Sequence, residues 1–159
     1  SKVKELAKQI EKDYAGEELL VVGILKGASV FCADLIREID LDVRMDFMVV
    51  SSYGSSTESS GTVKIIKDLD VDIENKNVLI VEDIIDSGLT LSSLVAALKT
   101  RRPKSLKLCT LLDKPQRRTA NIDVDYVGYV IEDKFIVGYG IDYDEKYRNL
   151  PYIGIVEDI

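Results

Sequence analysis

Continuous apolar runs of strand length alternate with helix-period patterns through the first two-thirds of the chain. Residues 19–25 and 78–81 are uninterrupted apolar runs, typical of strands that are covered on both faces. Helix-period spacing precedes the first run, over 3–14, and follows the two runs, over 30–39 and 91–98. Strands that alternate with helices in this way predict an α/β fold with a central, mainly parallel sheet flanked by helices.

Further apolar runs extend the expected sheet toward the C-terminus. Arg101, Arg102 and Pro103 end the third predicted helix. Additional strands are expected at 43–50, 62–66, 105–112, 126–131 and 153–156. No internal repeat is visible, so the chain reads as one domain spanning 1–159.

A serine-rich segment interrupts this order. Residues 51–61 contain six serines, two glycines and one tyrosine, a composition that a polar linker would also have. The segment lies inside one compact domain, however, where a loop of this length commonly covers a binding site. We therefore interpret it as a lid or binding loop. The runs at 43–50 and 62–66 would form an antiparallel arm with this loop at its tip.

Overall charge restricts the kind of partner. The net charge is −7 and the isoelectric point is about 4.7, which argues against nucleic acid as the main ligand. An acidic protein that binds a phosphorylated ligand must create local positive potential. Lysine, arginine, backbone N–H groups or a divalent cation can supply it.

The apolar runs and the cysteines bear on location. No run approaches the roughly 20 apolar residues needed to cross a bilayer, and the N-terminal segment SKVKELAKQ is polar. Cys32 and Cys109 lie in apolar stretches, as buried, reduced thiols of a cytosolic protein do. We expect a cytoplasmic protein without a membrane partner.

The chain contains no histidine. Ser-His-Asp catalysis, Cys-His catalysis and histidine-ligated zinc sites are therefore excluded. A general base that works near neutral pH must be a carboxylate, a lysine or a tyrosine.

The stretch from Val78 to Thr90, VLIVEDIIDSGLT, is the most informative part of the sequence. Glu82 and Asp83 follow the predicted strand at 78–81, and a third acid, Asp86, stands before the predicted helix. In an open parallel sheet, ligands bind beyond the carboxyl ends of the strands, and a helix N-terminus offers free N–H groups to an anion. The acids suit Mg²⁺ and the small-residue loop suits a phosphate, with Asp86 as a candidate base.

Two common nucleotide-binding motifs are missing. No G-x-x-x-x-G-K-[ST] sequence occurs, so the chain is not a P-loop nucleotidase. Gly138 and Gly140 begin a G-x-G pattern, but Tyr143 occupies the next expected glycine position and no helical pattern follows. Dinucleotide binding is therefore not expected.

The segment VEDIIDSGLT at 81–90 resembles the phosphoribosyl-pyrophosphate signature of the type I phosphoribosyltransferases. More narrowly, the whole chain resembles the bacterial hypoxanthine-guanine phosphoribosyltransferases. The supporting motifs, in the family's order, are LKGAS at 25–29, SSYG at 51–54, LLDKP at 111–115, KFIVGYGIDY at 134–143 and KYRNLP at 146–151. The resemblance implies the type I phosphoribosyltransferase fold, with a flexible lid loop at about 51–62 and a small hood formed mainly by the C-terminal part. In many relatives an N-terminal segment that this sequence does not contain contributes to the hood.

The resemblance also implies an activity. The family transfers 5-phosphoribosyl from phosphoribosyl pyrophosphate to N9 of hypoxanthine or guanine, giving IMP or GMP and pyrophosphate, with Mg²⁺ as cofactor. Asp86 would be the catalytic residue, close to N7 of the purine. The ribose and its 5′-phosphate would be bound by Glu82, Asp83, Asp86, Ser87, Gly88, Leu89 and Thr90. The expected metal ligands are Glu82, Asp83 and Asp142.

The remaining family roles concern the pyrophosphate, the purine and the lid. Pyrophosphate would be bound by Lys26, Gly27 and Arg148, and the peptide bond matching Leu25–Lys26 is often cis in the family. Ser52 and Tyr53 match the lid, which would close over the pyrophosphate side and exclude water. The purine would be bound by Lys114 at O6, Phe135 by stacking, Ile136 through its backbone and Asp142 near C2.

Two alternatives stay open beside this reading. One is a non-enzymatic, nucleotide-sensing regulator of the same fold, and the other is a xanthine-preferring phosphoribosyltransferase. Regulators that bind nucleic acid need a basic face or an added domain, and some lack an acid where Asp86 stands. Relatives are dimers or tetramers, so a homodimer or homotetramer is expected.

Overall fold

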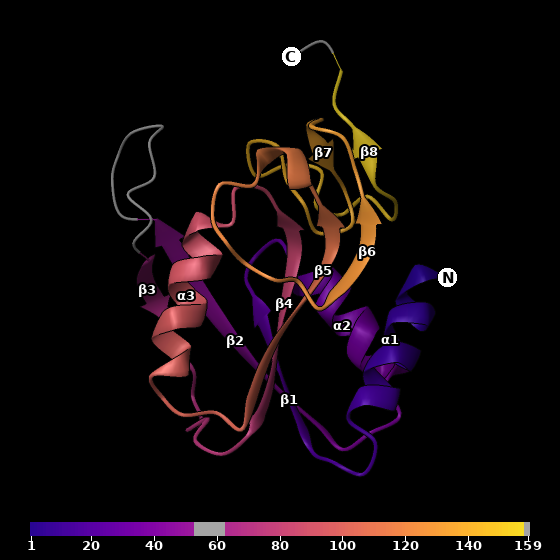
Figure 1. Ribbon diagram of the computed structural model, residues 1–159. Helices are drawn as coiled ribbons and strands as arrows, with labels where there is room; N and C mark the ends of the chain where they lie inside the picture. The colour runs from indigo at the N-terminus through magenta and orange to yellow at the C-terminus, as the bar shows by residue number, and fades with distance from the viewer. Residues whose placement is uncertain (53–62, 158–159) are drawn as a thin grey trace.

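A single mixed sheet forms the centre of the computed structural model, which describes residues 1–52 and 63–157. Its strand order is β3-β2-β1-β4-β5-β6, and only the pairing of β2 with β3 is antiparallel among these strands (Figure 1). The strands are β1 (Leu19–Ile24), β2 (Val43–Ser52), β3 (Val63–Lys67), β4 (Asn77–Ile85), β5 (Ser105–Asp113) and β6 (Tyr126–Val130). The predicted α/β fold with a mainly parallel sheet is confirmed.

Helices cover both faces of the sheet. On one face, α1 (Lys2–Asp13) and α2 (Ser29–Glu38) pack on a core that includes Phe31, Leu79 and Val81. On the other face, α3 (Leu89–Lys99) packs on a second core that includes Ile80 and Leu94. β1 is buried along its whole length, since both of its faces are covered, and this explains its unbroken apolar run.

The order of the sheet determines where a ligand site can form. The chain moves outward from β1 to β2 in one direction and from β4 to β5 in the other, so the topology reverses between the neighbouring strands β1 and β4. Open sheets bind ligands in the crevice beyond the carboxyl ends of the strands at such a reversal. The segments that follow β1, β4 and β5 all begin at this edge of the sheet.

The C-terminal part of the chain lies at the same edge. β7 (Ile136–Val137) and β8 (Gly154–Ile155) form a small antiparallel sheet, drawn above the carboxyl ends of β5 and β6 in Figure 1. A short 3₁₀ helix, η1 (Pro115–Arg117), follows β5. The small sheet lies where a C-terminal hood was expected, although the strand predicted at 153–156 is shorter.

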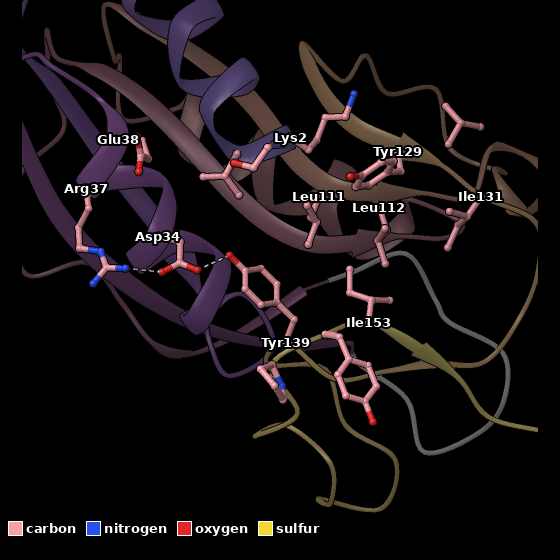
Figure 2. A pocket seen from close by; sticks show the side chains of 15 residues that line it. Lys2, Asp34, Arg37, Glu38, Leu111, Leu112, Tyr129, Ile131, Tyr139 and Ile153 are labelled. Atoms are coloured by element: carbon pink, nitrogen blue, oxygen red, sulfur yellow. Dashed lines mark hydrogen bonds and ion pairs between the residues drawn. The ribbon is translucent and has the colours of Figure 1, made fainter.

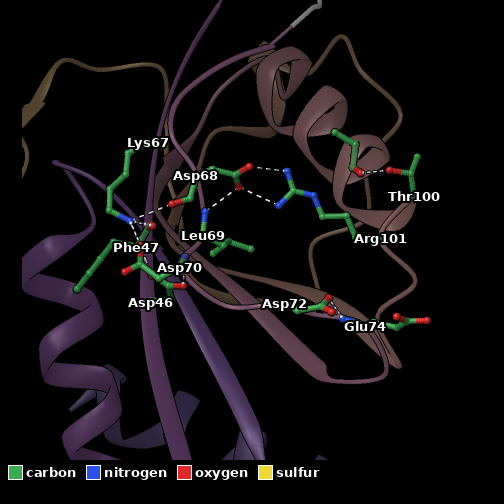
Figure 3. A network of polar contacts seen from close by, with 11 residues as sticks. Asp46, Phe47, Lys67, Asp68, Leu69, Asp70, Asp72, Glu74, Thr100 and Arg101 are labelled. Atoms are coloured by element: carbon green, nitrogen blue, oxygen red, sulfur yellow. Dashed lines mark hydrogen bonds and ion pairs between the residues drawn. The ribbon is translucent and has the colours of Figure 1, made fainter.

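The β2–β3 arm is fixed to the body of the protein at its base (Figure 3). Arg101, just beyond α3, donates two hydrogen bonds of 2.8 Å to the carboxylate of Asp68, just beyond β3. Asp46 in β2 is buried and accepts hydrogen bonds from the backbone N–H groups of Phe47 and Asp70. This network holds the exit of β3 against both β2 and α3. Of the predicted lid, Tyr53 and the rest of 53–62 lie outside the described residues.

The predicted end of the strand at 78–81 is wrong. The apolar run predicts a strand at 78–81, with Glu82 and Asp83 beyond it, whereas β4 continues to Ile85. The reason is the parallel ladder with β5, which pairs Glu82 with Thr110 and Ile85 with Asp113. The two acids are therefore held by strand hydrogen bonding and not by a loop.

No helix in 1–52 or 63–157 is both long enough and apolar enough to cross a membrane.

Candidate active site

Asp83 lies against the turn that follows β1. Gly27 has no side chain, and a Cβ built there would overlap the Asp83 carboxylate and lie 2.8 Å from its Cγ. The carboxylate also accepts a 2.6 Å hydrogen bond from the N–H of Ile84. The peptide bond between Leu25 and Lys26 is cis, as expected. The turn at 25–28 and β4 thus meet at the reversal point of the sheet, and this contact requires glycine at 27.

A cluster of charged side chains surrounds the Lys26 side chain. Its ammonium lies 3.2 Å from Glu145 Oε2, and Arg148 Nη2 lies 3.1 Å from Glu145 Oε1. Arg148 Nη2 also lies 3.5 Å from Asp142. The structure therefore brings together three residues predicted from distant segments, Lys26, Asp142 and Arg148, and adds Glu145.

The loop between β4 and α3 forms a small cradle. Gly88 adopts a left-handed conformation, with φ of 79°, and α3 begins immediately after it without a side-chain cap. The N–H of Leu89 donates to Ser87 Oγ at 3.3 Å, and the N–H groups of the next residues in the first turn of α3 are left for an anion. A hollow of about 180 Å³ is lined by Glu82 and by residues 84–91. The hydroxyl groups of Ser52 and Thr90 lie 3.1 Å apart, so the end of β2 reaches this cradle.

The segment after β5 holds the cradle from the other side. The N–H groups of Thr119 and Ala120 donate to the carbonyl oxygen of Ser87 at 3.0 and 3.1 Å. Arg118 Nε donates to the carbonyl oxygen of Asp86 at 3.1 Å, and its guanidinium pairs with Asp113. The cradle and the segment that carries Lys114 are therefore joined by hydrogen bonds to the backbone carbonyl groups of the cradle.

Lys114 and Asp86 face each other across this junction. The Lys114 ammonium lies 3.7 Å from Asp86 and 3.6 Å from Asp133, and Lys114 is only 7% exposed. Phe135 is 64% exposed and Ile136 begins β7. The predicted base and the predicted O6 donor are thus neighbours, and an exposed aromatic ring lies two residues from Asp133.

Burial destabilises the charged forms of the two acids in β4. It raises the pKa of Glu82 well above its usual range, and the neighbouring charge of Asp83 raises it further. Burial also raises the pKa of Asp83 to about 6, although the Ile84 N–H and the charge of Arg148 act in the opposite direction. Both side chains are only half-buried and can be reached by a ligand.

The side chains of Glu82 and Asp83 point to opposite faces of β4. Consecutive side chains of a strand alternate between its faces, so Glu82 lines the cradle near α3 while Asp83 faces Gly27. Within the described part of the chain, no three acidic, cysteine or histidine side chains gather into a metal cluster. The predicted set of Glu82, Asp83 and Asp142 is therefore not a preformed cage. A magnesium ion bound by one or two carboxylates and by substrate oxygens needs no such cage.

Three residues with contacts in the site were missing from the sequence-based prediction. Asp133 pairs with Lys114, and Glu145 bridges Lys26 and Arg148. Arg118 donates a hydrogen bond to the carbonyl oxygen of Asp86 in the cradle. Glu145 lies three residues from both Asp142 and Arg148, and Arg118 lies three residues after the motif at 111–115. This closeness to predicted segments was the available signal. The contacts of Glu145 with Lys26 and of Arg118 with Asp86 span 119 and 32 residues, too far along the chain for them to be inferred from the sequence.

A larger hollow lies elsewhere in the described structure. It has a volume of about 820 Å³ and is lined mainly by residues of α2, β5, β6 and the C-terminal segment (Figure 2). At its wall, the Tyr139 hydroxyl donates to Asp34, which also pairs with Arg37 at 2.8 Å. None of the predicted site residues lines it, so its size does not make it the active site.

Comparison with known proteins identifies the family. The family model described as the phosphoribosyl transferase domain matches residues 1–144. The chain belongs to this family. The matched range of this phosphoribosyl transferase contains both the β4–α3 loop and the turn that follows β1.

Curated relatives of this phosphoribosyl transferase carry more specific names. The hypoxanthine-guanine phosphoribosyltransferase of Bacillus subtilis (strain 168) is 58% identical over 98% of this chain and 87% of its own length. The "Bifunctional protein TilS/HprT" of Listeria innocua is also 58% identical over 98% of the chain. The chain spans only 24% of the length of that bifunctional relative.

Solved structures of other proteins resemble this structure closely. A hypoxanthine-guanine phosphoribosyltransferase from Bacillus anthracis is 60% identical, with a TM-score of 0.94 over 98% of this chain and 91% of that one. A hypoxanthine phosphoribosyltransferase from Staphylococcus aureus is 56% identical, with a TM-score of 0.95 over 98% of this chain and 85% of that one. The type I phosphoribosyltransferase fold is confirmed.

Replacing Gly27 with alanine should damage the site without unfolding the protein. The new methyl group would displace the Asp83 carboxylate, and misplacing a binding group by about 1 Å can cost up to roughly 100-fold. We expect isothermal titration calorimetry with magnesium pyrophosphate to show binding weakened at least about tenfold. Gly154→Ala is the control, because a Cβ at Gly154 meets nothing closer than 3.7 Å. Equal affinity of Gly27→Ala and wild type would contradict this account.

Asp83 should make stability depend on pH in a defined direction. Its pKa rises from 3.8 to about 6 on folding, so between these values the folded state binds more protons and stability falls as pH rises. Asp83→Asn cannot ionise and should be more stable than wild type at pH 8 by about 1–3 kcal/mol. The difference should shrink as pH falls toward 4. Urea unfolding of both proteins at several pH values, without Mg²⁺, measures the difference in free energy of unfolding. Asp123→Asn, at an exposed position, is the control. A difference that does not change with pH would refute the raised pKa of Asp83.

Proposed function

We propose that this chain catalyses the Mg²⁺-dependent transfer of 5-phosphoribosyl from phosphoribosyl pyrophosphate to N9 of hypoxanthine or guanine. The products are IMP or GMP and pyrophosphate, and the protein acts in purine salvage. The observation that carries this proposal is the convergence of three subsites at one edge of the sheet. They are the Lys26–Gly27 turn with Arg148, the cradle at 86–90, and the facing pair of Lys114 and Asp86.

The cradle suits a 5′-phosphate. The uncapped start of α3 provides backbone N–H groups and the positive end of the helix dipole. Ser87 and Thr90 add hydroxyl groups that can donate to phosphate oxygens, and the left-handed Gly88 lets the backbone approach closely. Glu82 lines the same hollow and is suited to accept a hydrogen bond from a ribose hydroxyl.

Magnesium would suit the two acidic side chains of β4, Glu82 and Asp83. Burial disfavours the charged forms of Glu82 and Asp83, and neither has a lysine or arginine partner within 4 Å among the described residues. A hard divalent cation, held by these carboxylates and by Asp142, would relieve that cost. When bound, it would supply charge stabilisation for the leaving pyrophosphate. Lys26 and Arg148 would bind the same leaving group.

Lys114 and Asp86 suit a 6-oxopurine. An ammonium group can donate to O6 but cannot accept from a 6-amino group, which argues against adenine. Asp86 can accept a proton at N7 as N9 attacks C1′, and of the two carboxylates beside Lys114 it is the one that also belongs to the cradle, in a chain without histidine. A carbonyl acceptor near Asp142 would suit the 2-amino group of guanine and would oppose the 2-oxo group of xanthine.

A spectrophotometric assay with phosphoribosyl pyrophosphate and Mg²⁺ tests the proposal directly. Hypoxanthine, guanine and xanthine are supplied separately, and nucleotide formation is followed. Turnover of hypoxanthine and guanine, with much slower turnover of xanthine, is the expected result. A preference for xanthine would support the alternative substrate. Ligand binding without turnover of any base would support a nucleotide-sensing regulator instead.

Asp86→Asn should separate catalysis from binding. Asparagine keeps the shape of the side chain but cannot take a proton, and loss of a general base commonly costs roughly 10²–10⁴-fold in rate. We expect kcat to fall within this range while KM for phosphoribosyl pyrophosphate changes little. Steady-state kinetics measure both, with Asp123→Asn as the matched exposed control. Near-normal kcat in Asp86→Asn would remove Asp86 as the base.

Two further properties belong to the proposal. We place the protein in the cytoplasm, on the basis of its buried cysteines, which are free. We also propose a homodimer or homotetramer with small-molecule substrates and no nucleic-acid or membrane partner. Sedimentation equilibrium of the purified chain measures the assembly state.

A further inference from the structure

One carboxylate bridges the two cations of the proposed pyrophosphate subsite. Glu145 Oε2 lies 3.2 Å from Lys26 Nζ, and Glu145 Oε1 lies 3.1 Å from Arg148 Nη2. Two oxygens of one anion therefore lie between a lysine and an arginine, as two oxygens of a phosphate group would. Lys26 and Arg148 come from segments more than 100 residues apart, and Glu145 connects them directly.

The backbone that presents Glu145 is unusual for glutamate. Tyr143 and Lys146 exchange backbone hydrogen bonds of 3.1 Å and close a two-residue turn. The central residues, Asp144 and Glu145, have φ values of 54° and 62°. Turns of this kind favour asparagine and glycine, and a residue with a longer side chain is less stable there. Local backbone preference therefore does not explain glutamate at 145, whereas its contacts with two cations do.

Arg148 has little capacity left for a ligand while Glu145 is in place. Nη1 donates to the carbonyl oxygen of Gly140 at 2.8 Å, and Nη2 faces Glu145 and Asp142. Nε is buried and has no hydrogen-bond partner within the described residues. An anion that binds to the exposed side of this guanidinium must therefore take the position that Glu145 Oε1 occupies.

We propose that Glu145 is a built-in counter-anion of the pyrophosphate subsite. It holds Lys26 and Arg148 near each other when the subsite is empty, and it competes with pyrophosphate for both. Glu145 thereby lowers the affinity for pyrophosphate and favours its release as a product. This inference rests on the proposed function.

The exposure of the Lys26–Glu145 ion pair fits a carboxylate that pyrophosphate can readily displace. The Lys26 and Glu145 side chains are 69% and 64% exposed, and exposed ion pairs are individually weak. Pyrophosphate carries more charge than one carboxylate and can displace it. The displaced Glu145 side chain can then be solvated, so the exchange leaves no buried charge unpaired.

The test compares Glu145→Gln with wild type by isothermal titration of magnesium pyrophosphate. Glutamine keeps the size of the side chain but removes its charge, so we expect the dissociation constant to fall about two- to fivefold. Product inhibition by pyrophosphate should tighten by the same factor, and KM for phosphoribosyl pyrophosphate should fall. Asp144→Asn is the control, because it removes one negative charge from the same turn and has no ion pair in the described structure.

Opposite results would overturn the inference. A purely structural role predicts weaker pyrophosphate binding and a higher KM in Glu145→Gln, and an equal effect in Asp144→Asn would indicate a general charge effect. Glu145→Gly provides a second variant, since glycine accommodates the left-handed backbone and removes the carboxylate. If wild type binds magnesium pyrophosphate but turns over no base, the proposed function fails while the titration still decides the role of Glu145. If wild type is active and both variants bind as wild type does, only this inference fails.

Discussion

Negative charge on a buried strand is the constraint around which this site is built. Glu82 and Asp83 are consecutive residues of β4, where burial disfavours their ionised forms. The surrounding structure leaves room for the Asp83 carboxylate without neutralising its charge. Gly27 has no side chain to occupy this space, and the Ile84 N–H donates a hydrogen bond to the carboxylate. Apolar residues at these positions would give a more stable protein. The magnesium ion of the proposed function would offset this cost when it arrives with the ligand.

A second feature is the rigid link between the cradle and the segment that carries Lys114, the proposed subsites for the phosphate and the purine. The carbonyl oxygens of Ile85, Asp86 and Ser87 all accept hydrogen bonds from the segment that follows β5. Arg118 supplies one of these bonds from a side chain that also pairs with Asp113. The distance between Lys114 and Asp86 is thus set mainly by backbone contacts. A purine and a ribose phosphate held at these two places would be oriented without large movement of either loop.

The sequence could predict those parts that depend on local pattern. Buried runs in β1 and β4 and the small-residue loop before α3 indicated a parallel sheet with an anion site, and in a chain without histidine Asp86 was a candidate base. The end of β4 was missed because its apolar pattern stops at Val81 while the ladder with β5 continues. Glu145 was missed because its role depends on a turn geometry and on a partner 119 residues away. Periodicity contains no information on such contacts.

The paired charges also explain how an acidic chain can bind a polyanion. Each cation of the site already has an acidic partner: Lys114 has Asp86 and Asp133, and Arg148 has Asp142 and Glu145. An incoming anion must therefore exchange with an acid of the chain, and that acid is left without its cation. A divalent cation that binds Asp83 and its neighbours restores the balance. Because pyrophosphate adds negative charge near Glu82 and Asp83 and a divalent cation offsets it, metal and pyrophosphate should each strengthen the binding of the other, by equal factors.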